Sequence, residues 1–291
     1  MPCAKKLLIQ NELIKYLSKD RPFEYFMQIQ GKVFRDVPGR KTLQANIDGK
    51  SYFIKQHFGV GWREIFKNLL SFKLPILSAI TEVNAIQKLN EIDIATTPLV
   101  GYGVRGCNPA HLQSFVITED LGEIISLEDL CADWKLNSPG TKFKRDLIIE
   151  VAKIARRLHE NGINHRDFYI CHLCLDLSLG ILNNKQVSEN IPIKLYLIDL
   201  HRVLIHQKIS VLDNMKDIAA LYFSSMDIGL TTRDYLRFKK HYIDSRKSLS
   251  DSQSQQNEFW KNVVIRANKL YAKFHSDKFQ KRLSAEKSAI R

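Results

Sequence analysis

Cysteine is scarce in this chain of 291 residues, and long apolar runs are absent. The five cysteines form an odd set without the spacing of a disulfide framework, which is typical of a protein in a reducing compartment. No window approaches the roughly 20 apolar residues that a membrane-spanning helix needs. The apolar segment from Leu7 to Ile9 is too short for the core of a secretory signal peptide. We therefore expect the protein to stay in the cytoplasm.

A second metal-binding pair of cysteines is also missing from the sequence. Cys171 and Cys174 form a single Cys-x-x-Cys pattern beside His172, whereas a structural zinc site would normally require a second pair. We interpret the two cysteines as small apolar side chains that flank a functional loop. Metal or redox chemistry at this pair is the alternative.

Acidic residues are too few to balance the basic ones. The sequence has 44 Lys and Arg against 31 Asp and Glu, which gives a net charge of +13 and a pI of about 9.4. Such an excess favours an anionic partner, whether nucleic acid, an anionic membrane surface, a phosphorylated glycan or an acidic protein. It does not choose among them, and a soluble protein that is merely basic remains an alternative. Because no recognised nucleic-acid-binding motif accompanies the charge, we expect no nucleic-acid partner.

The hydrophobic pattern changes character near residue 121. Before it, short alternating runs predict strands, including a hairpin around Asp48-Gly49, and after it longer helical stripes dominate. This order predicts an α+β, two-lobed fold with an N-terminal extension at residues 1–22, a sheet-rich N-lobe at 23–121 and a helical C-lobe at 122–291. The predicted helices cover residues 62–72, 81–89, 145–159, 216–223, 232–242 and 259–274. The predicted strands cover residues 41–47, 52–55, 115–117, 173–179 and 193–198, and a Ser/Gln-rich linker covers 248–257.

The most specific motif is the string His165-Arg166-Asp167, which follows a helix that Asn161-Gly162 ends. Further along the chain, Asp199 ends a predicted strand. Phosphoryl-transfer enzymes of the protein-kinase type place one carboxylate on a loop after a helix and a second at the end of a strand. Asp167 is therefore a candidate catalytic base that orients a substrate hydroxyl, and Asp199 is a candidate magnesium ligand. His165 and Arg166 are interpreted as supports of the loop.

A lysine and a glutamate precede these carboxylates in the order that phosphoryl transfer requires. Lys55 ends a predicted strand, from which its side chain could reach phosphate groups, and Glu82 lies on the next predicted helix and could hold the lysine through an ion pair. Taken alone, Lys55 is better explained as a solvated strand-end residue. Glu82 has an equally simple alternative, because glutamate is common in the first turn of a helix.

Residues 161–172 resemble the catalytic loop of the lipopolysaccharide core heptose(I) kinases, a bacterial branch of the kinase-like fold. The resemblance extends over residues 23–242, which is most of the chain. The segments that carry it are residues 51–55, 64–71, 117–121, 126–129, 131–134, 198–202 and 221–226.

The resemblance implies a protein-kinase-like fold and ATP-dependent phosphorylation of the first heptose of the lipopolysaccharide inner core, at its 4-hydroxyl. It implies that Lys55 contacts ATP phosphates, Asp167 acts as base and Asp199 binds Mg²⁺. Glu119 to Leu121 would form the hinge that faces adenine. The inner-core glycolipid would be the substrate, at the cytoplasmic face of the inner membrane, where the protein would make peripheral contact. Some members of the family associate with acyl carrier protein, an acidic partner that suits the positive charge.

Asp217 resembles the helix aspartate that braces the catalytic loop in kinase-like folds, and we interpret it as structural.

Several positions depart from the protein-kinase pattern. His172 stands where protein kinases place a metal-binding asparagine, and a neutral imidazole can ligate a metal although magnesium prefers oxygen. No Gly-x-Gly-x-x-Gly loop is present, and the widely spaced Gly31 and Gly39 are better explained by a simple turn. If this segment does cover ATP, Arg35, Arg40 or Lys41 would replace backbone contacts to phosphates with side-chain charge. No Ala-Pro-Glu follows Asp199, which argues against an activation loop.

Two other functions remain open at this point. The same fold could phosphorylate another core sugar, an aminoglycoside or a protein, or it could be a non-catalytic basic binding module. The aminoglycoside version fits poorly, since cationic substrates call for an acidic cleft. The apolar stripe of residues 259–274 predicts a helix that packs on the body of the protein, and contact with an anionic membrane is its alternative role.

Overall fold

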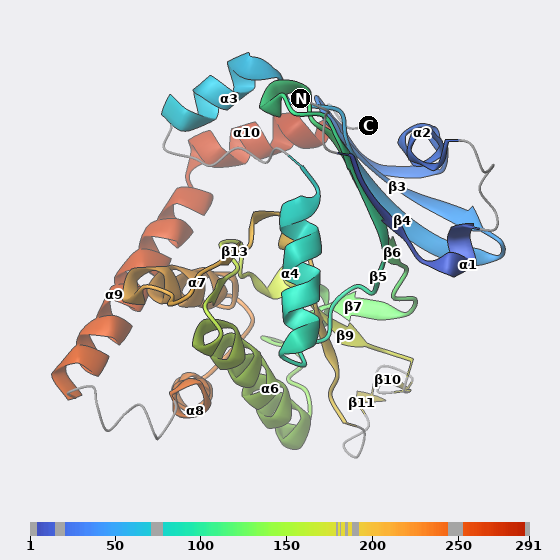
Figure 1. The fold of residues 1–291 in the computed structure, drawn as a ribbon. Helices are drawn as coiled ribbons and strands as arrows, with labels where there is room; N and C mark the ends of the chain where they lie inside the picture. The colour runs from blue at the N-terminus through green and yellow to red at the C-terminus, as the bar shows by residue number, and fades with distance from the viewer. Residues whose placement is uncertain are drawn as a thin grey trace. The chain divides into compact units, whose positions relative to one another are not determined.

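The computed structural model describes residues 5–14, 21–70, 78–178, 180, 182–183, 186–187, 192–243 and 253–288 (Figure 1). The chain divides into two compact units. The first consists of Met1–Gly122 together with Leu197–Val203, and the second of Glu123–Tyr196 together with Leu204–Arg291. The boundary expected after Leu121 thus falls beside this division, but the short segment that contains Asp199 belongs to the first unit.

The first unit is built on an antiparallel sheet with the strand order β1-β5-β6-β4-β3-β2. The segment expected as an N-terminal extension contributes β1, which pairs with β5 along its length. The strands of this sheet are β1 (Lys5–Ile9), β2 (Lys32–Val37), β3 (Arg40–Ile47), β4 (Lys50–His57), β5 (Leu99–Arg105) and β6 (Gln113–Glu119).

β3 and β4 form the hairpin that the sequence predicts around Asp48-Gly49. Both turn residues have positive φ, 54° and 76°, as a two-residue type I′ turn requires. Leu43 on β3 pairs with Ile54 on β4, and both side chains are fully buried. The core on this face of the sheet also contains the aromatic residues Phe23, Phe26 and Phe115.

Helix α4 confirms the helix predicted at residues 81–89. Its apolar residues Val83, Ile86 and Leu89 are buried, and the helix packs against β5, β6 and the 3-10 turn η3. Helix α3 begins at Gly61, and Phe72 of the predicted helix lies outside the described residues. The helical elements of this unit are α1 (Asn11–Ile14), α2 (Pro22–Gln28), α3 (Gly61–Leu70), α4 (Ile80–Glu91), η1 (Pro109–His111) and η3 (Leu200–Arg202).

The second unit is mainly helical. α6 buries the predicted stripe that contains Leu147, Val151 and Leu158, and α6 packs on α8 while α7 packs on α9. Its helical elements are α5 (Leu127–Leu130), α6 (Thr141–Glu160), η2 (Ile170–His172), α7 (Val211–Ser224), α8 (Thr232–Tyr242), α9 (Gln253–Phe274) and α10 (Asp277–Ser288). Its strands form small sheets from β7 (Ile124–Ser126), β8 (Ile163–Asn164), β9 (Leu173–Asp176), β10 (Leu182–Asn183), β11 (Gln186–Val187), β12 (Leu195–Leu197) and β13 (Leu204–Ile205).

Two predictions in this unit need correction. The sequence predicts a strand over residues 173–179, but β9 ends at Asp176, whose carboxylate accepts hydrogen bonds from the backbone and hydroxyl of Ser178 and so turns the chain. The sequence also predicts a linker over residues 248–257, whereas α9 already begins at Gln253. Glutamine has a good intrinsic helix propensity, so its composition did not exclude a helix. Residues 248–252 lie outside the described residues.

The helices of the described residues include none that is both long enough and apolar enough to cross a membrane.

Gly162, which ends α6, has φ of 75°, and an added Cβ there would lie 2.1 Å from the carbonyl oxygen of His206. Gly49 has nearly the same φ, 76°, but an added Cβ would meet nothing within 4 Å. We expect Gly49→Ala to lower the free energy of unfolding by about 1 kcal/mol, the cost of left-handed backbone alone. Gly162→Ala should cost at least ~2 kcal/mol more, since backbone atoms must also move. Denaturant unfolding followed by circular dichroism measures both, and equal losses would contradict the steric account.

Candidate active site

Lys55 and Glu82 form an ion pair inside the first unit. The Lys55 Nζ lies 2.6 Å from Glu82 Oε1, and the side chains are 29% and 4% exposed. Lys55 projects from β4, and Glu82 comes from the first turn of α4. A buried carboxylate is costly unless a cation or hydrogen-bond donors compensate it, so the pair holds the ammonium group at a fixed place. The alternative of a solvated strand-end lysine is thereby set aside.

Further basic side chains of the first unit interact electrostatically with this pair or with one another. The pKa of His57 falls to about 3, first because the ring is buried and then because of the charges of Arg40, Lys55 and His201. The pKa of Arg40 is lowered by burial and by Arg35, while the carboxylates of Asp199 and Glu82 oppose that shift. This part of the first unit therefore concentrates positive charge next to two carboxylates, an arrangement that suits the phosphate groups of a nucleotide and a metal ion bound to them.

Asp199 occupies the left-handed region of backbone space, with φ of 61° and ψ of 54°, immediately before η3. Non-glycine residues adopt this conformation rarely, and such residues are enriched at functional sites. The ring Nδ1 of His201 forms a short hydrogen bond with the Asp199 carboxylate. The hydrogen bonds from Thr96 to the Leu197 carbonyl and from Leu197 N–H to the Ala95 carbonyl fix the strand that leads to Asp199.

The β2–β3 hairpin stands at the position in the sequence where protein kinases have a glycine-rich loop. Gly39 turns the chain with φ of 80°, and Arg35 and Arg40 lie on β2 and β3 on either side of it. At Gly31, an added Cβ would lie 2.2 Å from the Gln44 carbonyl oxygen, so this glycine permits close approach of the two strands. Arg40 of this hairpin interacts electrostatically with the carboxylates of Glu82 and Asp199.

The segment expected as a hinge begins at the end of β6. Glu119 is exposed, and its N–H donates to the Pro98 carbonyl at 3.0 Å. Between Glu119 and the half-buried Leu121, the carboxylate of Asp120 accepts hydrogen bonds from Ser51 on β4 and Gln44 on β3. Burial by itself would raise the pKa of Asp120, but these bonds and one from Gly122 N–H lower it below its ordinary value. The carboxylate therefore ties the end of the sheet to two neighbouring strands.

In the second unit, Asp217 holds the loop that carries the His-Arg-Asp string. Its carboxylate accepts hydrogen bonds from the backbone N–H of His165 at 2.7 Å and of Arg166 at 2.8 Å. Asp217 is 1% exposed and His165 is fully buried. Arg166 has φ of 70°, a strained conformation that the two hydrogen bonds maintain. The structural role expected for Asp217 is confirmed.

Asp167 and His172 are brought together by the same loop. The ring Nδ1 of His172 lies 2.7 Å from the backbone carbonyl oxygen of Asp167, and the N–H of Tyr169 also donates to that oxygen. Since a carbonyl only accepts, Nδ1 of His172 carries a proton. In the neutral ring, Nε2 is then the unprotonated nitrogen, the atom that could ligate a metal. The first role of His172 is nevertheless to fix the backbone of Asp167.

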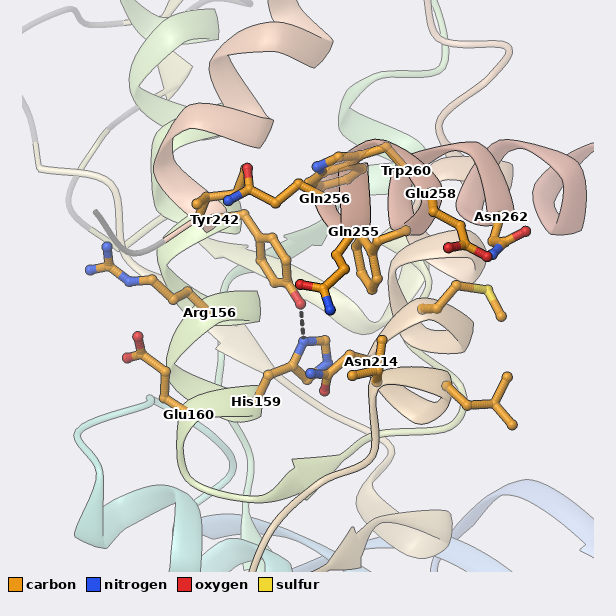
Figure 2. Close-up of a pocket in the computed structure, with 15 residues that line it drawn as sticks. Arg156, His159, Glu160, Asn214, Tyr242, Gln255, Gln256, Glu258, Trp260 and Asn262 are labelled. Atoms are coloured by element: carbon orange, nitrogen blue, oxygen red, sulfur yellow. Dashed lines mark hydrogen bonds between the residues drawn. The ribbon is translucent and has the colours of Figure 1, made fainter. Parts of the chain in front are cut away.

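The Asp217 carboxylate is linked to two further side chains, which Figure 2 shows at the wall of a cavity of about 600 Å³. Nε2 of His159 lies 3.4 Å from Asp217 Oδ2, and Nδ1 of His159 lies 2.7 Å from the Tyr242 hydroxyl. Burial and the charges of Asp217 and Glu160 raise the pKa of Tyr242 far above its ordinary value. Because the carboxylate accepts from Nε2–H, Nδ1 is the acceptor and the Tyr242 hydroxyl donates to it.

Aromatic contacts hold Tyr242 in this position. Its ring stacks with those of Phe238 and Phe259 and meets Trp260 edge to face. Phe259 and Trp260 belong to α9. The C-terminal helix therefore packs on the body of the second unit, as the sequence predicts.

The Cys171–Cys174 pair shows no sign of metal chemistry. Burial, with a smaller contribution from Asp129, raises the pKa of Cys174 to about 11, which opposes the thiolate form that a metal requires. Within the described residues, no group of three or more His, Cys, Asp or Glu side chains is arranged to hold a metal ion. One or two carboxylates suffice for magnesium, which takes its remaining ligands from water and phosphate.

The predicted site residues thus fall into two sets. Lys55, Glu82 and Asp199 belong to the first unit, with the hinge at Glu119 and Leu121, and Asp167 and His172 belong to the second. Sequence reasoning missed four contributors: His57, His159, His201 and Tyr242. For His57 a signal existed, because it lies two residues after Lys55 on one strand and so shares its face.

Comparison with known proteins agrees with these features. The sequence model of the lipopolysaccharide kinase (Kdo/WaaP) family matches residues 24–242. The chain is 42% identical over 265 residues to the lipopolysaccharide core heptose(I) kinase WaaP of Pseudomonas aeruginosa. This match covers 91% of this chain and 96% of that protein. It is 45% identical over 237 residues to the protein of the same name from Escherichia coli K12, with coverage of 81% and 87%.

A solved structure of a related protein also matches. It is described as WaaP in complex with acyl carrier protein, and it superposes with a TM-score of 0.74 and 36% identity, covering 91% of this chain and 99% of that one. The fold is therefore the kinase-like fold that the sequence predicts, with a sheet-rich and a helical part. The chain belongs to the lipopolysaccharide kinase (Kdo/WaaP) family, and the protein is a kinase.

The low pKa of His57 should be visible in the stability of the protein. The folded state keeps the ring neutral down to about pH 3, whereas in the unfolded chain it binds a proton near pH 6.5. The contribution of the neutral His57 ring to the free energy of unfolding is therefore complete above pH 6.5 and is lost as the pH falls toward 3. Between pH 7 and pH 5 we expect a loss of about 2 kcal/mol in the free energy of unfolding from this residue.

Denaturant unfolding of His57→Gln at both pH values tests this, because the variant should lose that part of the pH dependence. His111→Gln, which replaces an exposed histidine of the same unit, serves as the control. An unchanged pH dependence in His57→Gln would show that the ring binds a proton over the same pH range in the folded and unfolded states, which would contradict the lowered pKa.

Removal of the Tyr242 hydroxyl should leave Nδ1 of His159 buried without its donor. We expect Tyr242→Phe to lower the free energy of unfolding by about 1 to 3 kcal/mol and to change the ¹⁵N signals of the His159 ring, since the tautomer is no longer fixed. Tyr271→Phe is the matched control, because the Tyr271 hydroxyl contacts Asp227 at 3.3 Å in an exposed position. Unchanged ring signals in Tyr242→Phe would contradict the assigned direction of the hydrogen bond.

Proposed function

We propose that this protein transfers the γ-phosphoryl group of ATP to the 4-hydroxyl of the first heptose of the lipopolysaccharide inner core. The observation that carries the proposal is the ion pair between Lys55 and the buried Glu82, with Arg40 and His57 linked to it electrostatically, in a chain that matches the Kdo/WaaP family. The acceptor is taken from the names of the Pseudomonas and Escherichia coli relatives, which are heptose(I) kinases.

The first unit supplies the nucleotide subsite in this proposal. Lys55 contacts the phosphates, and its ion pair with Glu82 keeps the ammonium group in place. Arg40 adds a second positive charge from the β2–β3 hairpin. The hinge from Glu119 to Leu121 faces the adenine and reads it through backbone groups. The hydrogen bonds of Asp120 to Ser51 and Gln44 support a rigid hinge.

Asp167 is the proposed catalytic base. Its carboxylate accepts the proton of the heptose hydroxyl while the hydroxyl oxygen forms a bond to the γ-phosphorus. The bond between the γ-phosphorus and the bridging oxygen breaks, and ADP leaves with that electron pair. The contribution of the loop is positional: Asp217 holds the backbone of His165 and Arg166, and His172 holds that of Asp167.

Magnesium would be held by Asp199, where it would neutralise charge on the phosphates. The left-handed backbone at Asp199 and the hydrogen bond from His201 support a carboxylate with a defined orientation. His172 is a proposed second ligand through Nε2. Its Nδ1–H donates to the Asp167 carbonyl and fixes the tautomer, as is usual for histidines that bind metals.

The proposed substrate determines where the protein works. A heptose of the inner core is part of a membrane-embedded glycolipid, so the protein is placed in the cytoplasm and in peripheral contact with the cytoplasmic face of the inner membrane. Acyl carrier protein is a proposed partner, because the related solved structure is a complex with it. The net charge of +13 suits an acidic protein and an anionic surface alike.

Phosphate transfer from ATP to purified inner-core lipopolysaccharide tests the proposal. The wild-type protein should phosphorylate the first heptose, and mass spectrometry of the core should locate the new phosphate on that sugar. Asp167→Ala and Asp199→Ala should each lower the rate by at least ~10³-fold, since the base or the metal ligand is gone, with circular dichroism near that of the wild type.

Asp146→Ala is the control for loss of a carboxylate, because Asp146 forms an exposed ion pair with Lys142 on α6. Substantial activity in Asp167→Ala or Asp199→Ala would contradict the assigned roles. Transfer to a different core sugar would replace the acceptor while keeping the kinase. No transfer by the wild type, under conditions in which a related kinase is active, would favour the non-catalytic binding module.

A further inference from the structure

Helix α3 of the first unit presents an apolar stripe to solvent. Trp62, Phe66 and Leu70 are 47%, 56% and 83% exposed. Their spacing of four residues places them on one face of the helix, and the rings of Trp62 and Phe66 stack with centroids 5.8 Å apart. Large apolar side chains gathered in this way on a soluble surface mark an interaction site more often than single exposed ones do.

Helix α3 is anchored through Ile65 and its contact with η1, so the stripe has a fixed direction within the first unit. Ile65 is 5% exposed, and α3 packs against η1. The segment before the helix turns at Gly59, where φ is 87° and an added Cβ would lie 2.6 Å from the Ala110 carbonyl oxygen of η1. This close approach and the burial of Ile65 hold one side of α3 to the unit while the aromatic stripe points away from it.

Two cations lie beside the stripe. Arg63 and Lys67 follow Trp62 and Phe66 directly in the sequence, and both are exposed. One residue corresponds to 100° around a helix, so the cations border the apolar face on its outer side. A helix with aromatic and aliphatic residues on one face and Lys or Arg next to them matches the pattern of helices that lie in the interface of an anionic membrane.

Helix α9 is another basic helix with an apolar stripe, but part of that stripe packs within the protein. It packs along α7, and its residues Val263 and Ala267 are 2% and 0% exposed. Phe259 and Trp260 of α9 contact Tyr242. The apolar side of α9 is therefore used within the second unit, whereas that of α3 contributes Trp62, Phe66 and Leu70 to the surface.

We propose that α3 is the lipid-binding helix of this protein. Trp62, Phe66 and Leu70 insert among the headgroups of an anionic bilayer, and Arg63 and Lys67 contact lipid phosphates. The inference rests on the proposed function only in that a glycolipid acceptor requires a membrane contact. Since α3 follows β4, the strand that carries Lys55, membrane binding and the nucleotide subsite are joined by a short segment of chain.

Vesicle binding by the full-length protein tests this directly. The wild type should sediment with vesicles that contain phosphatidylglycerol and bind vesicles of phosphatidylcholine at least ~10-fold more weakly. Trp62 emission should shift to shorter wavelength on binding, while Trp134, which is 6% exposed, should not respond. Equal binding to both kinds of vesicle, or no shift of Trp62 emission on binding, would overturn the proposal.

Substitutions identify the helix. The triple change Trp62→Ser, Phe66→Ser, Leu70→Ser should weaken binding to anionic vesicles at least ~10-fold, and Arg63→Gln with Lys67→Gln should weaken it in proportion to the lost charge. Leu236→Ser is the matched control, because Leu236 is 57% exposed on α8 between Arg233 and Arg237. If the triple variant fails to fold, the single change Leu70→Ser takes its place. Undiminished binding by the folded variants would overturn the proposal.

Assays with two different acceptor substrates distinguish this proposal from the proposed function. With a deacylated, water-soluble core oligosaccharide, the triple variant should transfer phosphate at the wild-type rate, and with acceptor in vesicles it should be slower. A wild type that phosphorylates neither acceptor would overturn the proposed function, while vesicle binding would still decide the role of α3. If the variants bind vesicles normally but lose binding to acyl carrier protein, α3 is a protein-docking helix and the lipid assignment is wrong.

Discussion

In the second unit, the conformation of the loop that carries Asp167 depends on the hydrogen bonds that the Asp217 carboxylate accepts. A charge that is 1% exposed is tolerated because His165 and Arg166 donate backbone hydrogen bonds to it and the His159 ring faces it. These bonds hold the strained backbone at Arg166, which directly precedes Asp167. The position of the proposed base is therefore set from α7 as well as by His172 within the loop.

The first unit meets a different constraint, because cations that attract phosphate also repel one another. Here one basic residue is kept neutral: burial lowers the pKa of His57, so that it adds no charge beside Arg40 and Lys55. Glu82 compensates Lys55 from α4. The remaining positive charge is held on a rigid sheet, which limits the reorganisation needed when an anion binds.

Patterns along the chain predicted most of the helices and strands, but they predicted few of the contacts between elements that are distant in the sequence. The β3–β4 hairpin and α4 followed from local periodicity, and the Lys55–Glu82 pair followed from residue order. Tyr242 and His159 are far apart in the sequence, and neither residue type signals a buried hydrogen bond, so their pairing could be found only from the packing of α6 on α8. The start of α9 was misjudged because serine and glutamine are common both in linkers and in the polar faces of helices.

The contacts of Tyr242 with α9 have a consequence for the order in which the protein is made. Phe259 and Trp260 leave the ribosome after Asp167 and Asp199, yet they pack on the tyrosine that completes the support of Asp217. A nascent chain that has already exposed Asp167 and Asp199 therefore lacks part of the packing behind the loop that carries Asp167. Synthesis of α9 completes that packing, so the loop becomes fully supported only after α9 has left the ribosome.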